Sequence, residues 1–117
     1  MAAVAAAILP SMASAQNCKN PESQIAMNTC AARDYEREDA RLNKAYRDVI
    51  AKLEPAKREK LREVQRLWLS YRDLNCDFQT DDYVGGTMYS LVHSICLTEM
   101  SKQRTKDLKA MLEEASM

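Results

Sequence analysis

The scarcity of helix-breaking residues constrains the fold of this chain more than any other feature. The 117 residues include only two glycines, adjacent at Gly85-Gly86, and three prolines. Pro10 lies in an alanine-rich start, Pro21 precedes the first long periodic segment, and Pro55 divides the middle of the chain. Alanine, leucine, glutamate, lysine and arginine are abundant elsewhere, so we expect nearly all of the chain to be helical.

The spacing of apolar residues predicts three helices. The first runs from about Ser23 to Leu53, the second from about Pro55 to Phe78, and the third starts near Thr87 and continues to the C-terminus. In each segment apolar residues recur every three or four positions, which is the period of one helix face. Short connections make successive helices antiparallel neighbours. We therefore expect an all-α fold, an antiparallel helical hairpin with a third helix packed across it.

A turn near Pro55 predicts which residues of the hairpin lie level with one another. Asp39 should lie near Arg72, where a partly buried bidentate ion pair would suit the guanidinium. We interpret this region as a polar staple between helices in preference to a binding or catalytic cluster. The predicted staple comprises Asp39, Asn43, Arg72 and Asp73. The predicted core residues are Leu42, Tyr46, Trp68 and Tyr71.

The first fifteen residues have the features of the end of a secretory signal peptide. A short apolar run, residues 2–9, is followed by a proline and by the small residues Ala13-Ser14-Ala15. This order is typical of the hydrophobic region and cleavage site of an exported protein. The run is too short for a stable membrane span. The expected cleavage site contains no cysteine, so we expect no lipid anchor there. We expect residues 1–15 to be a signal peptide remnant and residues 16–117 to form one helical domain.

Four cysteines predict a disulfide-stabilised protein of the periplasm or the exterior of the cell. An even number of cysteines after an export signal indicates two disulfides in an oxidising compartment. Four cysteines allow three pairings. We favour the local pairing, Cys18 with Cys30 and Cys76 with Cys96, because it closes both irregular segments. The rival pairing joins Cys30 to Cys76 across the hairpin and leaves Cys18 for Cys96.

The charges are balanced overall but unevenly distributed. The formal net charge is zero, which argues against a nucleic-acid partner because such a partner requires a basic face. The segment from Lys52 to Arg66 holds six basic and three acidic residues, whereas the segment from Asp77 to Glu99 holds acidic residues and no lysine or arginine. One end of the molecule should therefore be basic and another acidic.

Catalytic and metal-binding chemistry has little support in the sequence. His93 is the single histidine, so a site built on several imidazoles is unavailable. Cysteines held in disulfides cannot act as nucleophiles. The adjacent aspartates Asp81 and Asp82 are more typical of a solvated turn than of a calcium site, which would need more oxygen ligands at alternating spacing. We expect no enzyme activity, no metal and no cofactor.

Several motifs in combination resemble one family of small secreted bacterial domains. They are Met27–Ala31, Asp39-x-x-Leu42-Asn43-x-x-Tyr46, Gln65-Arg66-x-Trp68-x-x-Tyr71-Arg72-Asp73-x-x-Cys76, Gly85-Gly86-Thr87, Cys96 and Arg104-x-x-x-Leu108. With these motifs the chain is similar to the lysozyme inhibitor LprI N-terminal domain family, from Cys18 to about Leu112. The resemblance implies an all-helical, disulfide-bonded envelope or secreted protein. It also implies, more loosely, inhibition of lysozyme.

Two functional hypotheses follow from the resemblance and the charge pattern. In the first, the protein occludes a lysozyme-type muramidase. Many lysozymes are basic and their clefts admit protruding loops, so the predicted contact residues lie in the acidic connection: Asp77, Asp81, Asp82 and Tyr83. In the alternative, the chain is a non-catalytic structural or protein-interaction module of the cell envelope. The sequence leaves the oligomeric state open.

Overall fold

The structure of the protein is a computed structural model that describes residues 17–117. The predicted signal peptide remnant, residues 1–15, lies outside these residues. Within them the chain forms α1 (Gln24–Lys52), α2 (Pro55–Gln79), a 3-10 turn η2 (Asp81–Tyr83) and α3 (Tyr89–Ala115). The prediction of an all-α fold with three packed helices and two disulfides is confirmed, and the helix bounds lie within about two residues of the expected ones.

Local interactions explain where the helices begin and end. The side chain of Ser23 caps α1 by accepting a hydrogen bond from the backbone N–H of Ala26 at 3.0 Å. Pro55 occupies the start of α2, where its missing N–H leaves no hydrogen bond unmade. Arg58 Nε then donates to the carbonyl oxygen of Ile50 at 2.9 Å. This bond satisfies a C-terminal carbonyl of α1 and fixes the tight turn between α1 and α2.

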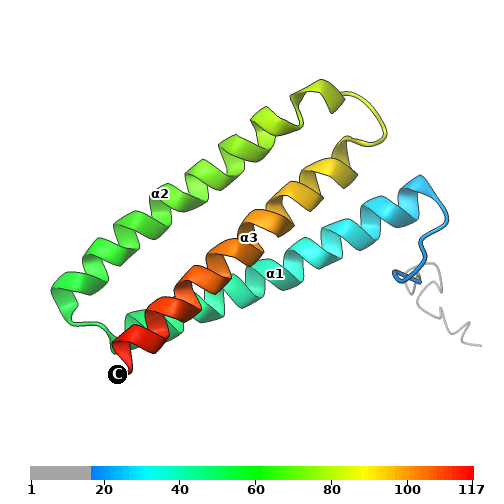
Figure 1. Cartoon of the computed structure of the whole chain (residues 1–117). Coiled ribbons are helices and arrows are strands. Elements are labelled where there is room, and N and C mark those ends of the chain that lie inside the picture. The colour runs from blue at the N-terminus through cyan, green and yellow to red at the C-terminus, as the bar shows by residue number, and fades with distance from the viewer. Residues whose placement is uncertain (1–16) are drawn as a thin grey trace, which may run out of the picture.

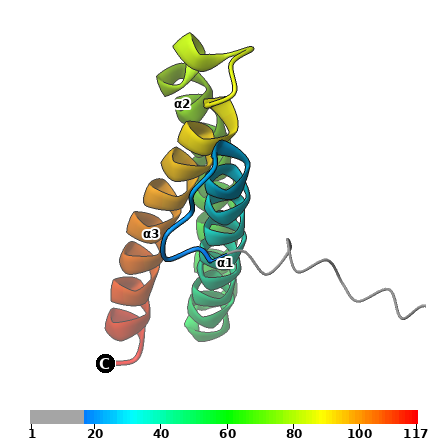
Figure 2. The same cartoon turned by 90° about the vertical axis from the view of Figure 1, so that its right-hand side faces the viewer.

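The closest helix pair is α1 with α3, which run in the same direction (Figure 1). α2 runs antiparallel to both and lies at the edge of the bundle, and the view turned by 90° again places α1 and α3 side by side (Figure 2). Small residues such as Ala31 and Ala45 on α1 and Ser94 and Ser101 on α3 are buried. Small side chains let two helix axes approach closely, which explains why this pair packs tighter than the two hairpin helices.

The hydrophobic core lies where the three helices converge, at the end of the bundle near the α1–α2 turn. Its buried members are Leu42, Ala45, Val49, Leu61 and Leu108. Tyr46 and Trp68 are partly buried and pack against this cluster. Leu42, a predicted core residue, is fully buried.

The prediction that Tyr71 belongs to the core is wrong, because this side chain is 59% exposed. Two rows of residues run along α2, and the apolar spacing in the sequence does not distinguish the row that faces the bundle from the row that is exposed. We call the row that faces the bundle the inward face: Leu61, Gln65, Trp68, Arg72 and Cys76. We call the exposed apolar row the α2 stripe: Val64, Leu67, Tyr71, Leu74 and Phe78. Arg72 occupies the inward position, so Tyr71 beside it points away from the core.

Candidate functional site

The connection between α2 and α3 is a compact series of turns. Thr80 is buried at the end of α2 and donates from Oγ1 to the carbonyl oxygen of Cys76 at 2.6 Å. The following 3-10 turn is closed by hydrogen bonds from the Tyr83 N–H to the Thr80 carbonyl, 2.9 Å, and from the Gly86 N–H to the Tyr83 carbonyl, 3.0 Å. Gly85 has a φ of +85°, a left-handed conformation that side-chain-bearing residues rarely adopt. A glycine is therefore favoured at position 85 of this turn.

A disulfide and a contact between a histidine and an aspartate hold the two sides of this connection together. Cys76 on α2 is bonded to Cys96 on α3, with their Cα atoms 5.7 Å apart. One turn further out, Asp77 Oδ1 lies 3.0 Å from His93 Nε2. The His93 ring also stacks on Tyr89, with the ring centroids 5.2 Å apart. The two helices thus enter and leave the connection at fixed positions.

The N-terminal arm and α1 support the same end of the molecule. Asn28 Nδ2 on α1 donates to the carbonyl oxygen of Thr87 at 3.1 Å, which links α1 to the connection. The second disulfide joins Cys18 to Cys30 and ties the arm to the first turns of α1. The bonded pairs are thus the local ones, and none of the four cysteines is free. The connection is restrained by all three helices, which favours a fixed shape over a mobile loop.

The four residues predicted to contact a partner are all exposed at this end. We call this set the acidic end: Asp77, Asp81, Asp82 and Tyr83. Val84, at the C-cap of the 3-10 turn, and Phe78, on the last turn of α2, add exposed apolar surface beside it. The acidic end therefore presents carboxylates next to aromatic and aliphatic side chains, a combination that suits a basic protein surface with apolar pockets.

The polar staple is centred on the Arg72 guanidinium, whose side chain is only 7% exposed. Its Nη1 lies 3.1 Å from Asp39 Oδ1 and 3.4 Å from Ser101 Oγ, and its Nε lies 3.0 Å from Asp73 Oδ1. Instead of the expected bidentate pair with Asp39 alone, the guanidinium divides its donors among three partners. Asn43 Nδ2 completes the staple with a long contact to Asp39 Oδ2 at 3.5 Å.

Aromatic rings surround the staple and change its electrostatics. The Arg72 guanidinium lies 5.3 Å from the centroid of the Tyr35 ring and 5.6 Å from that of Trp68. Burial raises the pKa of Tyr35 above its ordinary value, with Arg72 acting against the rise and Asp39 adding to it. Burial acts to lower the pKa of Arg72, but its hydrogen bonds with Asp73 and Asp39 and its attraction to Tyr35 raise it. Arg72 is thus held as a cation inside the bundle.

A second inward-facing arginine was not predicted from the sequence. Arg104 on α3 is buried, donates from Nε to Gln65 Oε1 at 3.0 Å, and lies 5.7 Å from the centroid of the Trp68 ring. Burial lowers the pKa of this guanidinium, and Asp107 acts in the opposite direction. Gln65 and Arg104 both occur in the quoted motifs, so their shared presence was a signal. Their contact required the register of α2 against α3, which the sequence did not provide.

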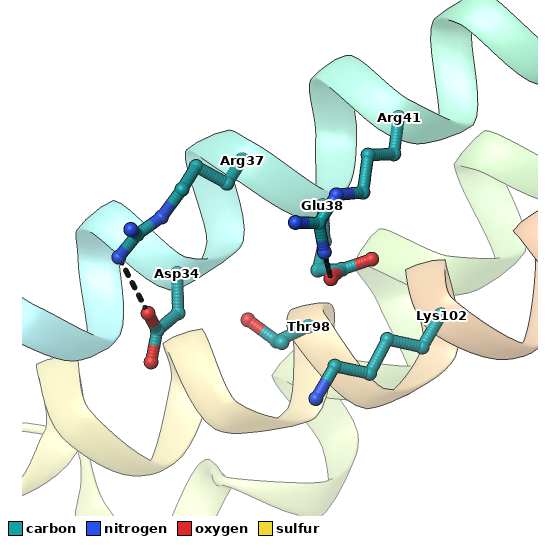
Figure 3. Close-up of a pocket in the computed structure, with 6 residues that line it drawn as sticks. All are labelled: Asp34, Arg37, Glu38, Arg41, Thr98 and Lys102. Carbon is teal, nitrogen blue, oxygen red and sulfur yellow. Dashed lines mark hydrogen bonds and ion pairs between the residues drawn. The ribbon is translucent and has the colours of Figure 1, made fainter.

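A polar hollow of about 350 Å³ lies between α1 and α3, away from the acidic end. Figure 3 shows the α1 side lined by two ion pairs, Arg37 with Asp34 at 2.9 Å and Arg41 with Glu38 at 2.5 Å. Thr98 and Lys102 line the α3 side. Because the two arginines are already neutralised by neighbouring carboxylates of α1, the hollow is poorly suited to attracting a charged ligand.

Within residues 17–117, histidine, cysteine, aspartate and glutamate side chains form no group of three or more that could hold a metal ion. In the same part of the chain, no helix is both long and apolar enough to cross a membrane.

Comparison with known proteins places the chain in a family. A family model described as lysozyme inhibitor LprI matches residues 14–108. An uncharacterized protein of Rhizobium meliloti (strain 1021) is 35% identical over 112 residues, which covers 85% of this chain and 81% of the relative. No solved structure matches the chain. The family match spans α1, α2, the acidic end and most of α3, so the protein belongs to the lysozyme inhibitor LprI family.

Proposed function

We propose that this protein is a periplasmic or secreted binding protein that inhibits a lysozyme-type muramidase by occluding its cleft, without catalysis of its own. The observation that carries the proposal is the match to the lysozyme inhibitor family over residues 14–108. Two disulfides support an oxidising location, because such bonds persist mainly outside the cytoplasm. The signal peptide remnant expected at residues 1–15 agrees with export.

We propose that the acidic end makes the contact with the muramidase. Its carboxylates are exposed, and a basic enzyme surface would be attracted to them before contact is made. Tyr83 is the expected aromatic anchor, since it combines apolar area with a hydroxyl group. The Cys76–Cys96 disulfide and the Asn28–Thr87 hydrogen bond support the proposal, because a braced connection loses little conformational entropy on binding.

A lysozyme turbidity assay with the purified, oxidised protein tests the function directly. The parent protein should slow the clearing of a bacterial cell-wall suspension, and binding kinetics should show an association rate that falls with added salt. The Asp81→Asn/Asp82→Asn variant should associate more slowly and with a weaker salt dependence. Tyr83→Ala should mainly speed dissociation, because an anchor in a desolvated pocket acts after encounter.

A matched control separates the acidic end from the effect of total charge. Glu113→Gln/Glu114→Gln removes the same two charges from the exposed C-terminal end of α3, at the far end of the molecule from the connection (Figure 1). It should leave inhibition almost unchanged. A triple variant at Asp81, Asp82 and Tyr83 that bound as tightly as the parent would move the site elsewhere. A parent protein that bound no lysozyme would favour the alternative, a structural or protein-interaction module of the cell envelope.

A further inference from the structure

The α2 stripe is a row of large apolar side chains left in contact with solvent. Its five members are between 50% and 79% exposed, and they follow one another at intervals of three, four, three and four residues. This is the spacing of a helix that packs lengthwise on another helix. By contrast, α1 and α3 each carry one large apolar side chain with comparable exposure, Ile25 and Ile95.

The size of the α2 stripe indicates that a partner covers it. From Val64 to Phe78 it extends about 21 Å along the helix. Its exposed apolar area is on the order of several hundred Å², the size of the largest apolar patch on a typical monomeric protein, which is often functional. Two such areas facing each other would reach the lower range of stable protein interfaces, about 1,200 Å² in total. A second copy of the same stripe therefore provides enough surface.

An apolar hollow of about 270 Å³ continues the stripe at the N-terminal end of α2. It lies where the three helices converge, and its rim includes Val64, the first member of the stripe. The hollow is lined by Val49, Leu53, Lys57, Lys60, Leu61, Val64 and Met111. Phe78, the last member of the stripe and its most exposed side chain, projects from the opposite end of α2.

We propose that two copies of this chain associate through the α2 stripe, antiparallel and related by a two-fold axis near Tyr71. In this arrangement residues equally distant from Tyr71 meet, so Phe78 of each copy lies against Val64 of the other and fills its apolar hollow. Leu67, four residues before Tyr71, lies within one residue of level with Leu74, three residues after it, and the two Tyr71 side chains face one another. The stripe is self-complementary in this way, as a two-fold interface requires.

The charges along α2 favour the antiparallel orientation. Its first two turns carry an excess of basic residues, Lys57, Arg58, Lys60 and Arg62 against Glu59, whereas its last turns and η2 carry Asp73, Asp77, Asp81 and Asp82. Antiparallel pairing brings the basic end of one copy to the acidic end of the other, with Lys60 in the first turns of α2 and Asp82 in η2 just beyond its last turn. Parallel pairing would place like charges together.

Sedimentation velocity of the purified, oxidised protein over a range of concentrations tests the association. The parent should show a monomer–dimer equilibrium. Leu74→Glu should raise the dimer dissociation constant on the order of 100-fold, because it would bury an unpaired carboxylate. Ile25→Glu is the matched control, since Ile25 on α1 is 73% exposed and Leu74 is 69% exposed, and it should leave the constant unchanged. Melting curves of both variants verify that they are folded.

Charge exchange tests the orientation. Lys60→Glu and Asp82→Lys should each weaken the dimer several-fold, and combining them should restore most of the affinity, because the exchanged pair would again attract. A double variant weaker than either single variant overturns the antiparallel arrangement. A parent that remains monomeric at about 1 mM chain overturns the proposal. A dimer whose dissociation constant Leu74→Glu and Ile25→Glu change equally also overturns it. If the parent is monomeric and Leu74→Glu loses lysozyme binding, the proposal is overturned and the stripe is assigned to lysozyme.

The association is measured without lysozyme, so its failure leaves the proposed inhibition untouched. Asp82 belongs to both proposed surfaces. A second copy and a muramidase should therefore compete, and adding lysozyme should shift the parent towards the monomer.

Discussion

The two faces of α2 differ in a way that reverses the usual relation between polarity and burial. The inward face includes Gln65 and Arg72, both buried, whereas the α2 stripe is apolar and exposed. On the inward face both buried polar side chains have partners: Arg72 meets Asp39, Asp73 and Ser101, and Gln65 accepts from Arg104. Buried polar groups are tolerated when they have hydrogen-bond partners. A large apolar row on the surface of a single chain is typical of a site that a binding partner covers.

Trp68 on the inward face and Leu67 on the α2 stripe provide the largest expected contrast. Trp68→Ala should lower the free energy of unfolding by about 3–5 kcal/mol, since the ring packs on the core and under two guanidinium groups. Leu67→Ala should change it by less than about 1 kcal/mol. Urea unfolding at low protein concentration, where the chain is monomeric, measures both. Equal losses would mean that the two faces are not distinct.

The disulfide at Cys76 should be the next largest contributor. Replacing Cys76 and Cys96 together with alanine should cost about 3 kcal/mol, because the bond closes a loop of about twenty residues and Cys76 is fully buried. The matched pair Cys18→Ala/Cys30→Ala should cost less, since it releases only the N-terminal arm. Thermal unfolding of the two variants measures which disulfide contributes more stability. A larger loss for Cys18→Ala/Cys30→Ala would contradict the expectation that the Cys76–Cys96 bond between α2 and α3 contributes more.

Arg72 and its neighbour Tyr71 test the comparison at adjacent positions. Arg72→Met removes the guanidinium donors of Asp39 Oδ1 and Ser101 Oγ from a buried position, so it should cost about 2–3 kcal/mol. The cost stays below that of a fully buried ion pair because Asp39 is 35% exposed. Tyr71→Ala, on the stripe, should change stability by about 0.5 kcal/mol or less at low concentration. A larger loss for Tyr71 than for Arg72 would contradict the assignment of faces.

The smallest expected effect is a pH dependence that originates next to Arg72. The pKa of Tyr35 is raised by burial, so the folded protein holds the phenol proton at a pH where the unfolded chain has begun to lose it. The stabilisation is complete below pH 10 and is lost as the pH rises through the folded-state pKa. Unfolding free energies measured between neutral pH and pH 11 should fall more steeply for the parent than for Tyr35→Phe. Parallel curves would show that Tyr35 contributes nothing to this dependence.

Much of the fold could be predicted because local chemistry determines it. Pro55, Ser23 and the glycine pair act within a few residues of their own positions, so they indicated the helix ends without knowledge of the rest of the chain. The same is true of the two disulfides, because Cys18–Cys30 joins the N-terminal arm to α1 and Cys76–Cys96 joins the helices on either side of one short connection.

The features that the sequence did not predict correctly depend on packing between helices. Tyr71 and Arg72 are one position apart, and the apolar pattern predicted that Tyr71 faces the core. The pattern contains no information about Ser101 on α3, which accepts a hydrogen bond from the Arg72 guanidinium and favours the inward position for Arg72. In the same way, the tight α1–α3 pairing and the contact between Gln65 and Arg104 depend on register between distant segments. The residues proposed to meet a partner are exposed, and exposure alone leaves no repeating pattern in a sequence.

The pairing of α1 with α3 has a consequence for the order in which the chain folds. A chain made from its N-terminus completes α1 before α3 exists, and all of α2 separates the two helices. The apolar side of α1, with Leu42 and Val49 at its centre, therefore stays exposed until α3 packs on it, unless another part of the chain or another protein covers it temporarily. Closing so long a segment raises the entropic cost of the decisive contact and slows folding. The Cys18–Cys30 bond can form early, whereas Cys76 and Cys96 can join only after the return of α3 has begun.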